Sequence, residues 1–293
     1  MSVYEKIIEQ FPIVSYKEDR ERDGRLEKIY DKEVKNLADG VVYKKSLYRK
    51  GNGHDVWCYI TEVSPKANVS FAVSAGPLKK IAPVLSRAEE FDGNVLFAMN
   101  AGFFHFFNNG DRTPYGIQIV RGVVLAEPGR ERLDMSTFFF GVTKNGQAII
   151  ADSDAYFDGL KNDLEYAVGG GLMLIKDGRI TLHQGGDQHP RTAVGIAKDG
   201  TVILMCCDGR SEISAGFTYG DIIDCYINLG YEIENLLNLD GGGSTTVVLR
   251  GENGLFIDNI PCNALNPEFV GTDKEFVSRA RPVSDTVLIV EKD

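Results

Sequence analysis

The chain has 293 residues, of which 43% are hydrophobic and 25% are charged, and this composition is typical of globular proteins. Its formal net charge of −10 argues against nucleic acid or an anionic membrane surface as a partner. No apolar run approaches the roughly 18–20 residues of a membrane span, and the charged N-terminus lacks the apolar core of a signal peptide. Five cysteines without a Cys-x-x-Cys pair favour buried free thiols over disulfides or zinc. We therefore expect a cytoplasmic protein.

The N-terminal part of the chain differs in texture from the rest. The first eleven residues carry apolar side chains at helical spacing, and Pro12 ends that pattern. Residues 17–36 are dense in charge of mixed sign, which is typical of a solvated helix or a mobile arm. We therefore predict a helical, charged N-terminal appendage over residues 1–40, without chemistry of its own. One large domain is expected over residues 41–293.

From Val41 onward, short apolar runs alternate with turns, which is the pattern of β-strands. Val95–Met99 is apolar throughout, so we expect a strand that is buried on both faces. The other predicted strands are 56–63, 69–74, 117–120, 123–125, 137–142, 148–150, 173–175, 179–182, 193–197, 202–207, 233–239, 247–249 and 286–290.

Two helices are predicted among these strands. Residues 78–91 suggest a crossover helix that Pro83 interrupts, and a second helix is expected between an N-cap at Thr218 and a stop at Gly230. Many strands with few helices predict an α+β domain (mixed α/β). Its core is expected to be a mixed, mainly antiparallel β-sheet with a few flanking helices.

The stretch Asn238–Thr246 is the most distinctive in the chain. It places Asp240 after an apolar run, follows it with Gly241, Gly242 and Gly243, and then begins a run of hydroxyl side chains. Glycine loses more backbone entropy on folding than any other residue, so three in a row indicate positive φ or a close approach of the backbone to something else. A tight turn needs fewer glycines, and we therefore interpret this stretch as part of a site.

Three further polar clusters adjoin apolar runs. Asn100 follows one run, Asp208 follows another, and Arg191-Thr192 precedes a third, with Arg210 close to Asp208 in sequence. Asp-Gly is a common turn dipeptide, so any one of these clusters alone could be a turn. Together, polar groups beside glycines at strand ends indicate a functional site.

Several well-known site patterns are missing. Neither Gly-Gly-Gly run has the Gly-Lys-Ser/Thr ending of a phosphate loop, and Ser244 lacks a Gly-x-Ser-x-Gly nucleophile elbow. The four histidines show no helical metal spacing, which makes a zinc enzyme a poor interpretation. A hard divalent cation, Ca²⁺ or Mg²⁺, held by carboxylates stays open.

Five motifs in order carry a resemblance. They are Asn100–Phe104, Gly169–Gly171, Pro190–Gly195, Asp208–Arg210 and Asn238–Thr245. Over residues 95–290 the chain resembles the phosphodiester glycosidase family. It departs from the family pattern at His189, where asparagine is expected before Pro-Arg-Thr. This departure either adjusts substrate choice or is a tolerated change.

The resemblance implies hydrolysis of a sugar-1-phosphodiester, such as one of N-acetylglucosamine, in a small molecule or a glycan. A phosphate ester leaves readily as an anion, so the demand for a general acid is smaller than in ordinary glycosidases. Asp240 is the expected base or nucleophile, and Asp208 the second carboxylate or an orienting partner. The residues expected to bind phosphate or sugar oxygens are Asn100, Arg191, Thr192, Arg210, Gly241, Gly242, Gly243, Ser244 and Thr245.

Two alternatives accompany this interpretation. Arg191 could instead form a structural ion pair with Asp208 or Asp240. The whole domain could also be a non-catalytic module that binds a carbohydrate or a sugar phosphate.

Overall fold

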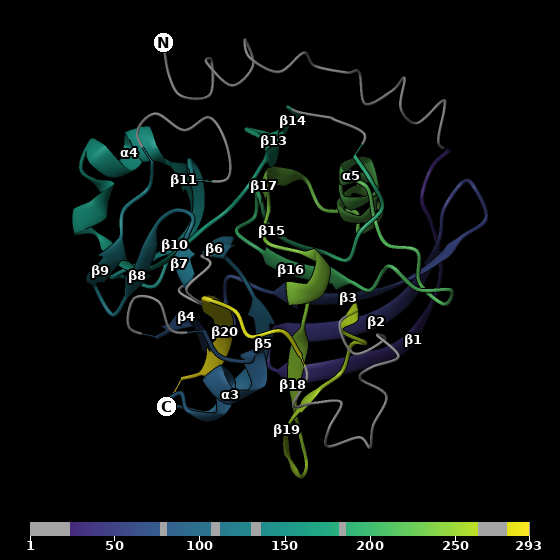
Figure 1. The fold of residues 1–293 in the computed structure, drawn as a ribbon, viewed down its shortest axis with the longest axis horizontal. Coiled ribbons are helices and arrows are strands. Elements are labelled where there is room, and N and C mark those ends of the chain that lie inside the picture. The colour runs from purple at the N-terminus through teal and green to yellow at the C-terminus, as the bar shows by residue number, and fades with distance from the viewer. Residues whose placement is uncertain are drawn as a thin grey trace.

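The computed structural model describes residues 24–76, 81–106, 112–129, 136–181, 186–262 and 280–292. Strands dominate this part of the chain, and they form three larger sheets and one hairpin (Figure 1). Every strand pair with a resolved register in the described residues runs antiparallel. The predicted α+β class with a mainly antiparallel core therefore holds in outline, but the fold is dominated by strands rather than mixed.

The eight-stranded sheet has the order β1 (Glu27–Ala38), β2 (Val41–Arg49), β3 (Asp55–Val63), β16 (Val202–Cys207), β15 (Arg191–Ala197), β17 (Ile233–Asn238), β13 (Met173–Lys176) and β14 (Arg179–Ile180). The β5 sheet has the order β19 (Gly254–Ile257), β18 (Val247–Gly251), β5 (Val95–Asn100), β20 (Asp285–Glu291) and β4 (Val69–Ala75). The β10 sheet has the order β11 (Ala148–Asp152), β10 (Phe138–Thr143), β12 (Leu164–Gly169), β8 (Gln118–Val120) and β9 (Val123–Ala126).

The remaining elements are short. A hairpin is formed by β6 (Phe104–Phe106) and β7 (Arg112–Pro114), and the described helices are α3 (Val84–Glu89), α4 (Ser153–Phe157) and α5 (Tyr219–Asn228). Single 3₁₀ turns lie at Leu160–Asn162 and Gly242–Ser244. None of the helices in the described part is long and apolar enough to cross a membrane.

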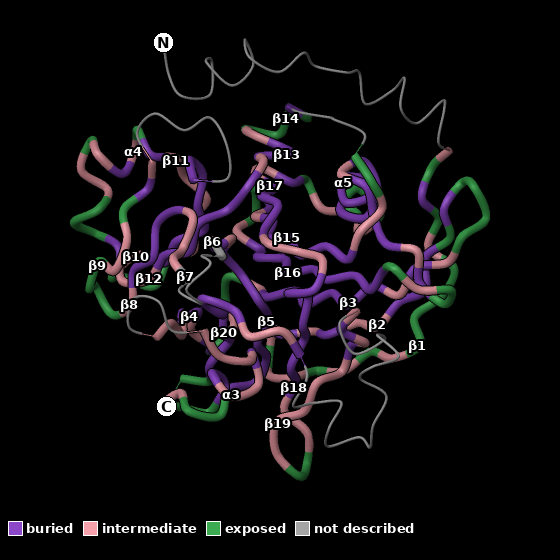
Figure 2. Tube along the Cα trace, viewed as in Figure 1, coloured by how far each residue is buried: buried purple, intermediate pink, exposed green. Residues whose placement is uncertain are grey.

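The main core lies where the sheets face one another. One buried cluster joins side chains of the eight-stranded sheet, such as Val194 and Leu237, to side chains of the β5 sheet, such as Phe97 and Ile289. Figure 2 shows these central strands as the purple, buried part of the molecule. Burial on this scale, at about 25 cal/mol per Å² of apolar surface, is what holds the sheets together.

Helices α3 and α5 cover the outer faces of two sheets. Ile222 and Ile223 of α5 pack on the eight-stranded sheet, and Val84 and Ala88 of α3 pack on the β5 sheet. Every residue of β5 is therefore buried, as its uninterrupted apolar sequence predicted.

Most of the predicted strands are present within about two residues of their predicted bounds. The helix after Thr218 is confirmed in detail, because the Thr218 side chain accepts from the backbone of Asp221 and the Asp221 side chain accepts in return. Its stop at Gly230 is also confirmed, with a φ of 82°. The crossover helix is only Val84–Glu89 and begins after Pro83, and the prediction for residues 77–80 lies outside the described residues.

The prediction of a helical, charged appendage over residues 1–40 is wrong for Glu27–Ala38. Glu27–Ala38 is a long strand, β1, paired along its length with β2 as the edge of the eight-stranded sheet. Charges of mixed sign cover an exposed edge strand as well as a solvated helix, and charged side chains protect such an edge from pairing with other chains. The domain therefore includes β1, and the prediction for residues 1–23 lies outside the described residues.

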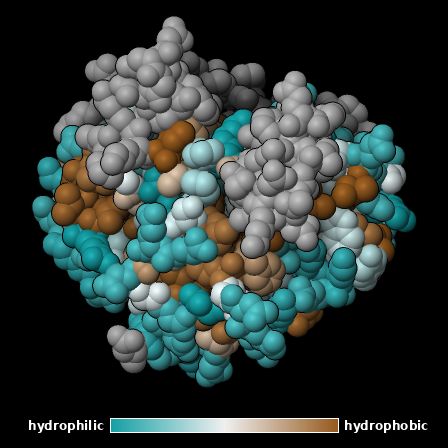
Figure 3. Space-filling model, turned by 60° about the horizontal axis from the view of Figure 1, so that its bottom comes forward, coloured by the Kyte–Doolittle hydropathy of each residue, from teal (hydrophilic) through white to brown (hydrophobic). Residues whose placement is uncertain are grey.

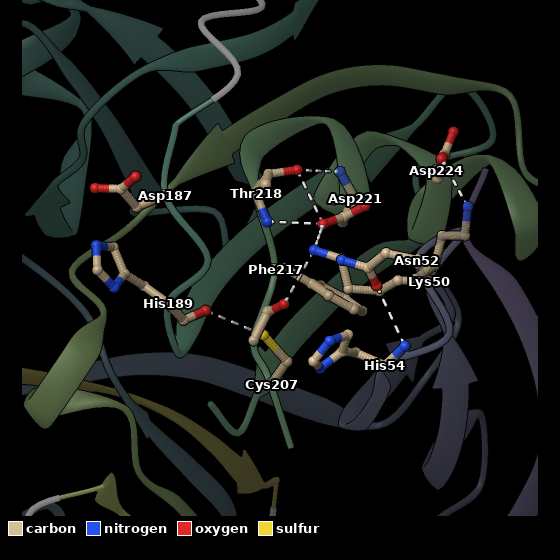
Figure 4. A network of polar contacts seen from close by, with 12 residues as sticks. Lys50, Asn52, His54, Asp187, His189, Cys207, Phe217, Thr218, Asp221 and Asp224 are labelled. Carbon is tan, nitrogen blue, oxygen red and sulfur yellow. Dashed lines mark hydrogen bonds and ion pairs between the residues drawn. The ribbon is translucent and has the colours of Figure 1, made fainter. Parts of the chain in front are cut away.

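A buried ion pair ties β2 to the start of α5. Lys50 Nζ lies 2.6 Å from Asp221 Oδ2, with both side chains 4% exposed, and it also donates to the carbonyl of Gly216 (Figure 4). Removal of one partner would leave an uncompensated buried charge. The pair thus fixes the segment Gly216–Thr218. Phe217 in this segment forms hydrogen bonds with Arg191 and with the backbone of His189.

The surface mixes apolar and polar side chains. On the face drawn in Figure 3, apolar residues (brown) form separate patches among hydrophilic ones (teal). Four of the five cysteines are buried free thiols, as predicted, and Cys262 is partly exposed.

Candidate active site

Three of the four predicted polar clusters meet at one edge of the eight-stranded sheet. Arg191, at the start of β15, pairs with Cys207, at the end of β16, and Ala193 pairs with Asn238, at the end of β17. Antiparallel pairing therefore brings the first residues of β15 together with the residues that follow β16 and β17.

The fourth cluster joins this edge from the β5 sheet. Thr192 Oγ1 donates to Asn100 Oδ1 over 2.9 Å, and Asn100 Nδ2 donates to the carbonyl of Asp240 over 2.6 Å. The Asp240 N–H donates in turn to the carbonyl of Ala101. Asn100 thus connects the two sheets and clamps the glycine loop.

Asn100 and Thr192 do not have the predicted role. Both are fully buried, with 0% exposure, and their side-chain oxygens are used by protein partners, including the backbone N–H of Thr246 on Asn100 Oδ1. They cannot touch a sugar or a phosphate from this position, so they support the site instead.

The glycine loop is shaped by the strand beside it. A side chain at Gly241 would place its Cβ 2.5 Å from the carbonyl oxygen of Pro190, and Gly242 has a φ of +61°. The amide of Gly241 donates to Asp240 Oδ1 and that of Gly242 to the Pro190 carbonyl, both over 2.8 Å. Two of the three amides expected to hold an anion are thus occupied by protein acceptors.

The end of the loop is closed to solvent. Gly243, Ser244 and Thr245 are buried, which removes them from direct contact with a substrate. The Thr245 carbonyl accepts from Asn259, which ties the loop to the segment after β19. These residues shape the loop rather than bind substrate.

Asp240 keeps the features of a reactive group. It is partly exposed, and desolvation raises the pKa of its carboxyl to about 6. The neighbouring Ser244 hydroxyl, the hydrogen bond from the amide of Gly241 and the positive charge of Arg281 lower the pKa, while Asp285 raises it. A carboxyl poised near neutrality can take up or release a proton under physiological conditions.

Asp208 is a buried anchor. Its carboxylate is 3% exposed and accepts from Tyr59 Oη over 2.6 Å, Asn259 Nδ2 over 3.0 Å and the Ile260 amide over 3.2 Å. Desolvation raises its pKa to about 6, and these hydrogen bonds oppose the rise. Through Asn259 it supports the glycine loop, which fits the predicted orienting role better than that of a second catalytic carboxylate.

Arg191 is used by the protein itself. Its guanidinium donates to the carbonyls of Phe217 over 3.0 Å and Asp187 over 2.8 Å, and it lies 4.3 Å from the centre of the Tyr219 ring. The side chain is 8% exposed, and neither Asp208 nor Asp240 is among these partners. Arg191 is therefore a poor candidate for binding phosphate. Its side chain is held by backbone carbonyls, and not by the predicted ion pair with Asp208 or Asp240.

Arg210 is the exposed cation of the site. It has a φ of 60°, which is uncommon for a residue other than glycine. A Cβ on Gly242 would lie 3.1 Å from its guanidinium, so the guanidinium rests directly on the glycine loop. Its Nε donates to His189 Nδ1 over 3.2 Å.

His189 is neutral in this arrangement, because its Nδ1 accepts a hydrogen bond. Burial and the charges of Arg210 and Arg191 lower its pKa, and Asp187 opposes this effect. The departure from the family pattern thus lies in contact with the exposed arginine of the site.

Two charged residues of this region, Arg281 and Asp285, were not predicted from the sequence. Asp285, at the start of β20, accepts from the Gly102 amide over 2.6 Å and from Gln118 Nε2 over 2.7 Å. A signal for Asp285 exists, since it precedes an apolar run as Arg191-Thr192 does. Arg281 follows residues 263–279, outside the described part, and carried no sequence signal.

No metal centre is evident in the part of the chain that the structure describes. There, no group of three or more His, Cys, Asp or Glu side chains lies close enough together to hold an ion. The divalent cation considered from the sequence stays a prediction.

Comparison with known proteins decides the family. A family model described as phosphodiester glycosidase matches residues 93–290, more than half of the chain. The chain belongs to the phosphodiester glycosidase family. The resemblance found in the sequence motifs is thereby confirmed.

Solved structures of other proteins share this fold. The catalytic domain of zebrafish N-acetylglucosamine-1-phosphodiester alpha-N-acetylglucosaminidase, auto-inhibited by its pro-peptide, matches with a TM-score of 0.65 and 22% identity, over 96% of this chain and 95% of that one. A hypothetical protein from Synechocystis matches with a TM-score of 0.60 and 16% identity, over 88% of this chain and 64% of that one. At these identities the likeness is one of fold.

A relative found by sequence is described as an uncharacterised prophage-derived protein. The protein YomE, derived from the SPbeta prophage of Bacillus subtilis strain 168, is 34% identical to this phosphodiester glycosidase homologue over 96 residues. That stretch covers 31% of this chain and 14% of the prophage protein.

Proposed function

We propose that the protein hydrolyses a sugar-1-phosphodiester to a free sugar and a phosphomonoester, with Asp240 as base or nucleophile. One observation carries the proposal: Asp240 is a partly exposed residue whose carboxyl has a pKa of about 6 and feels the charge of Arg281, and the exposed Arg210 rests on its loop. The activity named for the zebrafish relative suggests N-acetylglucosamine as the sugar.

One ionised carboxylate is enough for this reaction. As a base, Asp240 removes a proton from water while the water oxygen bonds to the anomeric carbon and the phosphomonoester departs with the bonding electrons. As a nucleophile, it bonds to the anomeric carbon first, and water then hydrolyses the glycosyl-enzyme. In both routes the leaving group is an anion that Arg210 can stabilise.

The rate is expected to rise with pH through the pKa of Asp240. The carboxylate must be ionised in either route, so kcat/KM should increase between about pH 5 and pH 7, with a midpoint near 6. The pH profile of kcat/KM measures this. A rate that falls over the same range would make Asp240 a general acid and would contradict the proposal.

UDP-N-acetylglucosamine is a suitable probe, because it contains a sugar-1-phosphodiester whose charge does not change between pH 4 and 8. Release of N-acetylglucosamine is expected, measured with and without Ca²⁺ or Mg²⁺. Hydrolysis in ¹⁸O-labelled water should place the label in the sugar, which reports attack at the anomeric carbon. If the protein binds UDP-N-acetylglucosamine but releases no N-acetylglucosamine at any pH or with either metal, the proposal is contradicted. The protein would then be a non-catalytic binding module.

A change at Gly242 tests the position of Arg210. Gly242→Ala should raise KM about tenfold, because the new methyl group meets the guanidinium at 3.1 Å. Gly230→Ala is the matched control, since Gly230 also has a positive φ, +82°, but has no atom within 4 Å of its Cβ position. Both variants should lose stability through backbone strain, and only Gly242→Ala should change KM. Equal KM values would show that Arg210 is not a ligand of the substrate.

A further inference from the structure

The residue that departs from the family pattern contacts the exposed cation of the site. We infer that His189 is a positioning residue that holds the Arg210 guanidinium over the glycine loop, and that protonation of His189 releases it and weakens binding of a phosphodiester. The identity of the anion rests on the proposed function, whereas the contact between His189 and Arg210 does not.

The backbone at His189 is fixed independently of its side chain. His189 and Phe217 exchange two backbone hydrogen bonds, of 3.2 Å and 2.9 Å, and Cys207 Sγ donates to the His189 carbonyl. Figure 4 shows the imidazole projecting away from Phe217 and Cys207, on the side where Asp187 lies. A substitution of the side chain should therefore leave the fold intact.

The contact restricts a side chain that would otherwise have many conformations. Arg210 is exposed, and an exposed arginine side chain loses rotamer entropy when it is fixed. The hydrogen bond from its Nε to His189 Nδ1 leaves the two terminal nitrogens of the guanidinium toward the loop, where Gly242 meets them. Pre-positioning a ligand-binding group in this way raises affinity by reducing the entropy lost on binding.

Protonation of His189 reverses the contact. A neutral Nδ1 accepts the Nε–H of Arg210, whereas an imidazolium has a proton at Nδ1 and a positive charge that repels the guanidinium. Three charged groups face the imidazole: Arg210 from the segment after β16, Arg191 from β15, and Asp187 from the segment before it. Burial and the charges of the two arginines together outweigh the effect of the aspartate, so the pKa of His189 is expected to lie below the ordinary histidine value of 6.5.

Binding can be measured without turnover in the full chain carrying Asp240→Asn, which also removes the titration of Asp240. By calorimetry at pH 7.5, adding His189→Ala should weaken binding of UDP-N-acetylglucosamine about fivefold to tenfold. His189→Asn should restore most of this loss, because its Oδ1 accepts from nearly the same place as Nδ1. His54→Ala, at an exposed histidine in the turn before β3, is the matched control and should change nothing.

The pH dependence separates positioning from simple packing. Between pH 7.5 and 5, the chain with His189 should lose affinity, and the His189→Asn chain should lose much less. Residual dependence in the asparagine variant belongs to other groups, such as Asp208. An equal pH dependence in both chains, or no effect of His189→Ala, would overturn the inference.

A readout without ligand distinguishes this inference from the proposed function. In ¹⁵N NMR spectra, the Nε–H of Arg210, assigned through Arg210→Lys, should titrate with the same midpoint as the His189 ring. Shared titration without any hydrolysis would uphold the inference and defeat the proposed function. If the protein hydrolyses the substrate and the Arg210 signal does not change when His189 is protonated, the proposed function is upheld and the inference about His189 is contradicted.

Discussion

Asp240→Asn is expected to lower kcat for UDP-N-acetylglucosamine about 10³-fold while the fold stays intact, since removal of a catalytic base or nucleophile typically has this effect. The amide keeps the acceptor for the Gly241 N–H but cannot take a proton or attack the anomeric carbon. Asp92→Asn, which removes an exposed carboxylate in the turn before β5, is the control and should keep the wild-type rate. A wild-type rate for Asp240→Asn would remove Asp240 from the chemistry.

The same variant should be more stable than the wild type at high pH. The folded-state pKa of Asp240 is raised above 3.8, so the folded protein holds the proton more tightly than the unfolded chain and loses stability as pH rises through about 6. Asparagine has no proton to lose. The Tm of Asp240→Asn should therefore exceed that of the wild type at pH 8, and the difference should shrink toward pH 4. Such a gain marks a residue kept for activity at the expense of stability.

Asp208→Asn is expected to lower the free energy of unfolding by about 2–4 kcal/mol, because one carboxylate oxygen becomes an amide that faces N–H donors. Those donors belong to Asn259, which is buried, and to Ile260, which is partly buried. Urea unfolding measures the loss. The folded fraction should keep most of its kcat, since Asp208 acts through the loop it supports.

A double-mutant cycle sharpens this test. Asn259→Ala breaks the same network from the other side, so the two changes together should destabilise the protein by less than the sum of the single effects. A fall in kcat of about 10³-fold without a loss of stability would instead establish Asp208 as a second catalytic carboxylate.

Local patterns predicted much of this fold because their physical causes are local. The cap at Thr218 lies three residues from its partner Asp221, and the apolar run in β5 records burial on both faces. β1 was missed because its place depends on pairing with β2, and its own pattern of charges fits an exposed edge strand as well as a helix. The sequence predicted whether a segment is a helix or a strand wherever that conformation does not depend on pairing with a segment far away in the chain.

The candidate site divides in the same way. Grouping Asn100, Thr192, Asp208 and Asp240 from their positions beside apolar runs was sound, because the ends of neighbouring strands meet at one edge. Whether each side chain faces solvent or protein depends on contacts made by residues far away in sequence. The sequence therefore predicted which residues lie close together, but it assigned substrate binding to residues such as Asn100 and Thr192 that are buried.

The near-complete burial of Asn100, Thr192 and Asp208 has a consequence for how relatives of this protein should be compared. Several of the motif residues that reveal kinship are buried and hold the loops in place. Under the proposed function, the side chains open to a ligand are those of Asp240 and Arg210, which the motifs include, and of His189, which precedes a motif. Two proteins can therefore share every motif and still accept different sugars, so kinship and specificity have to be inferred from different residues.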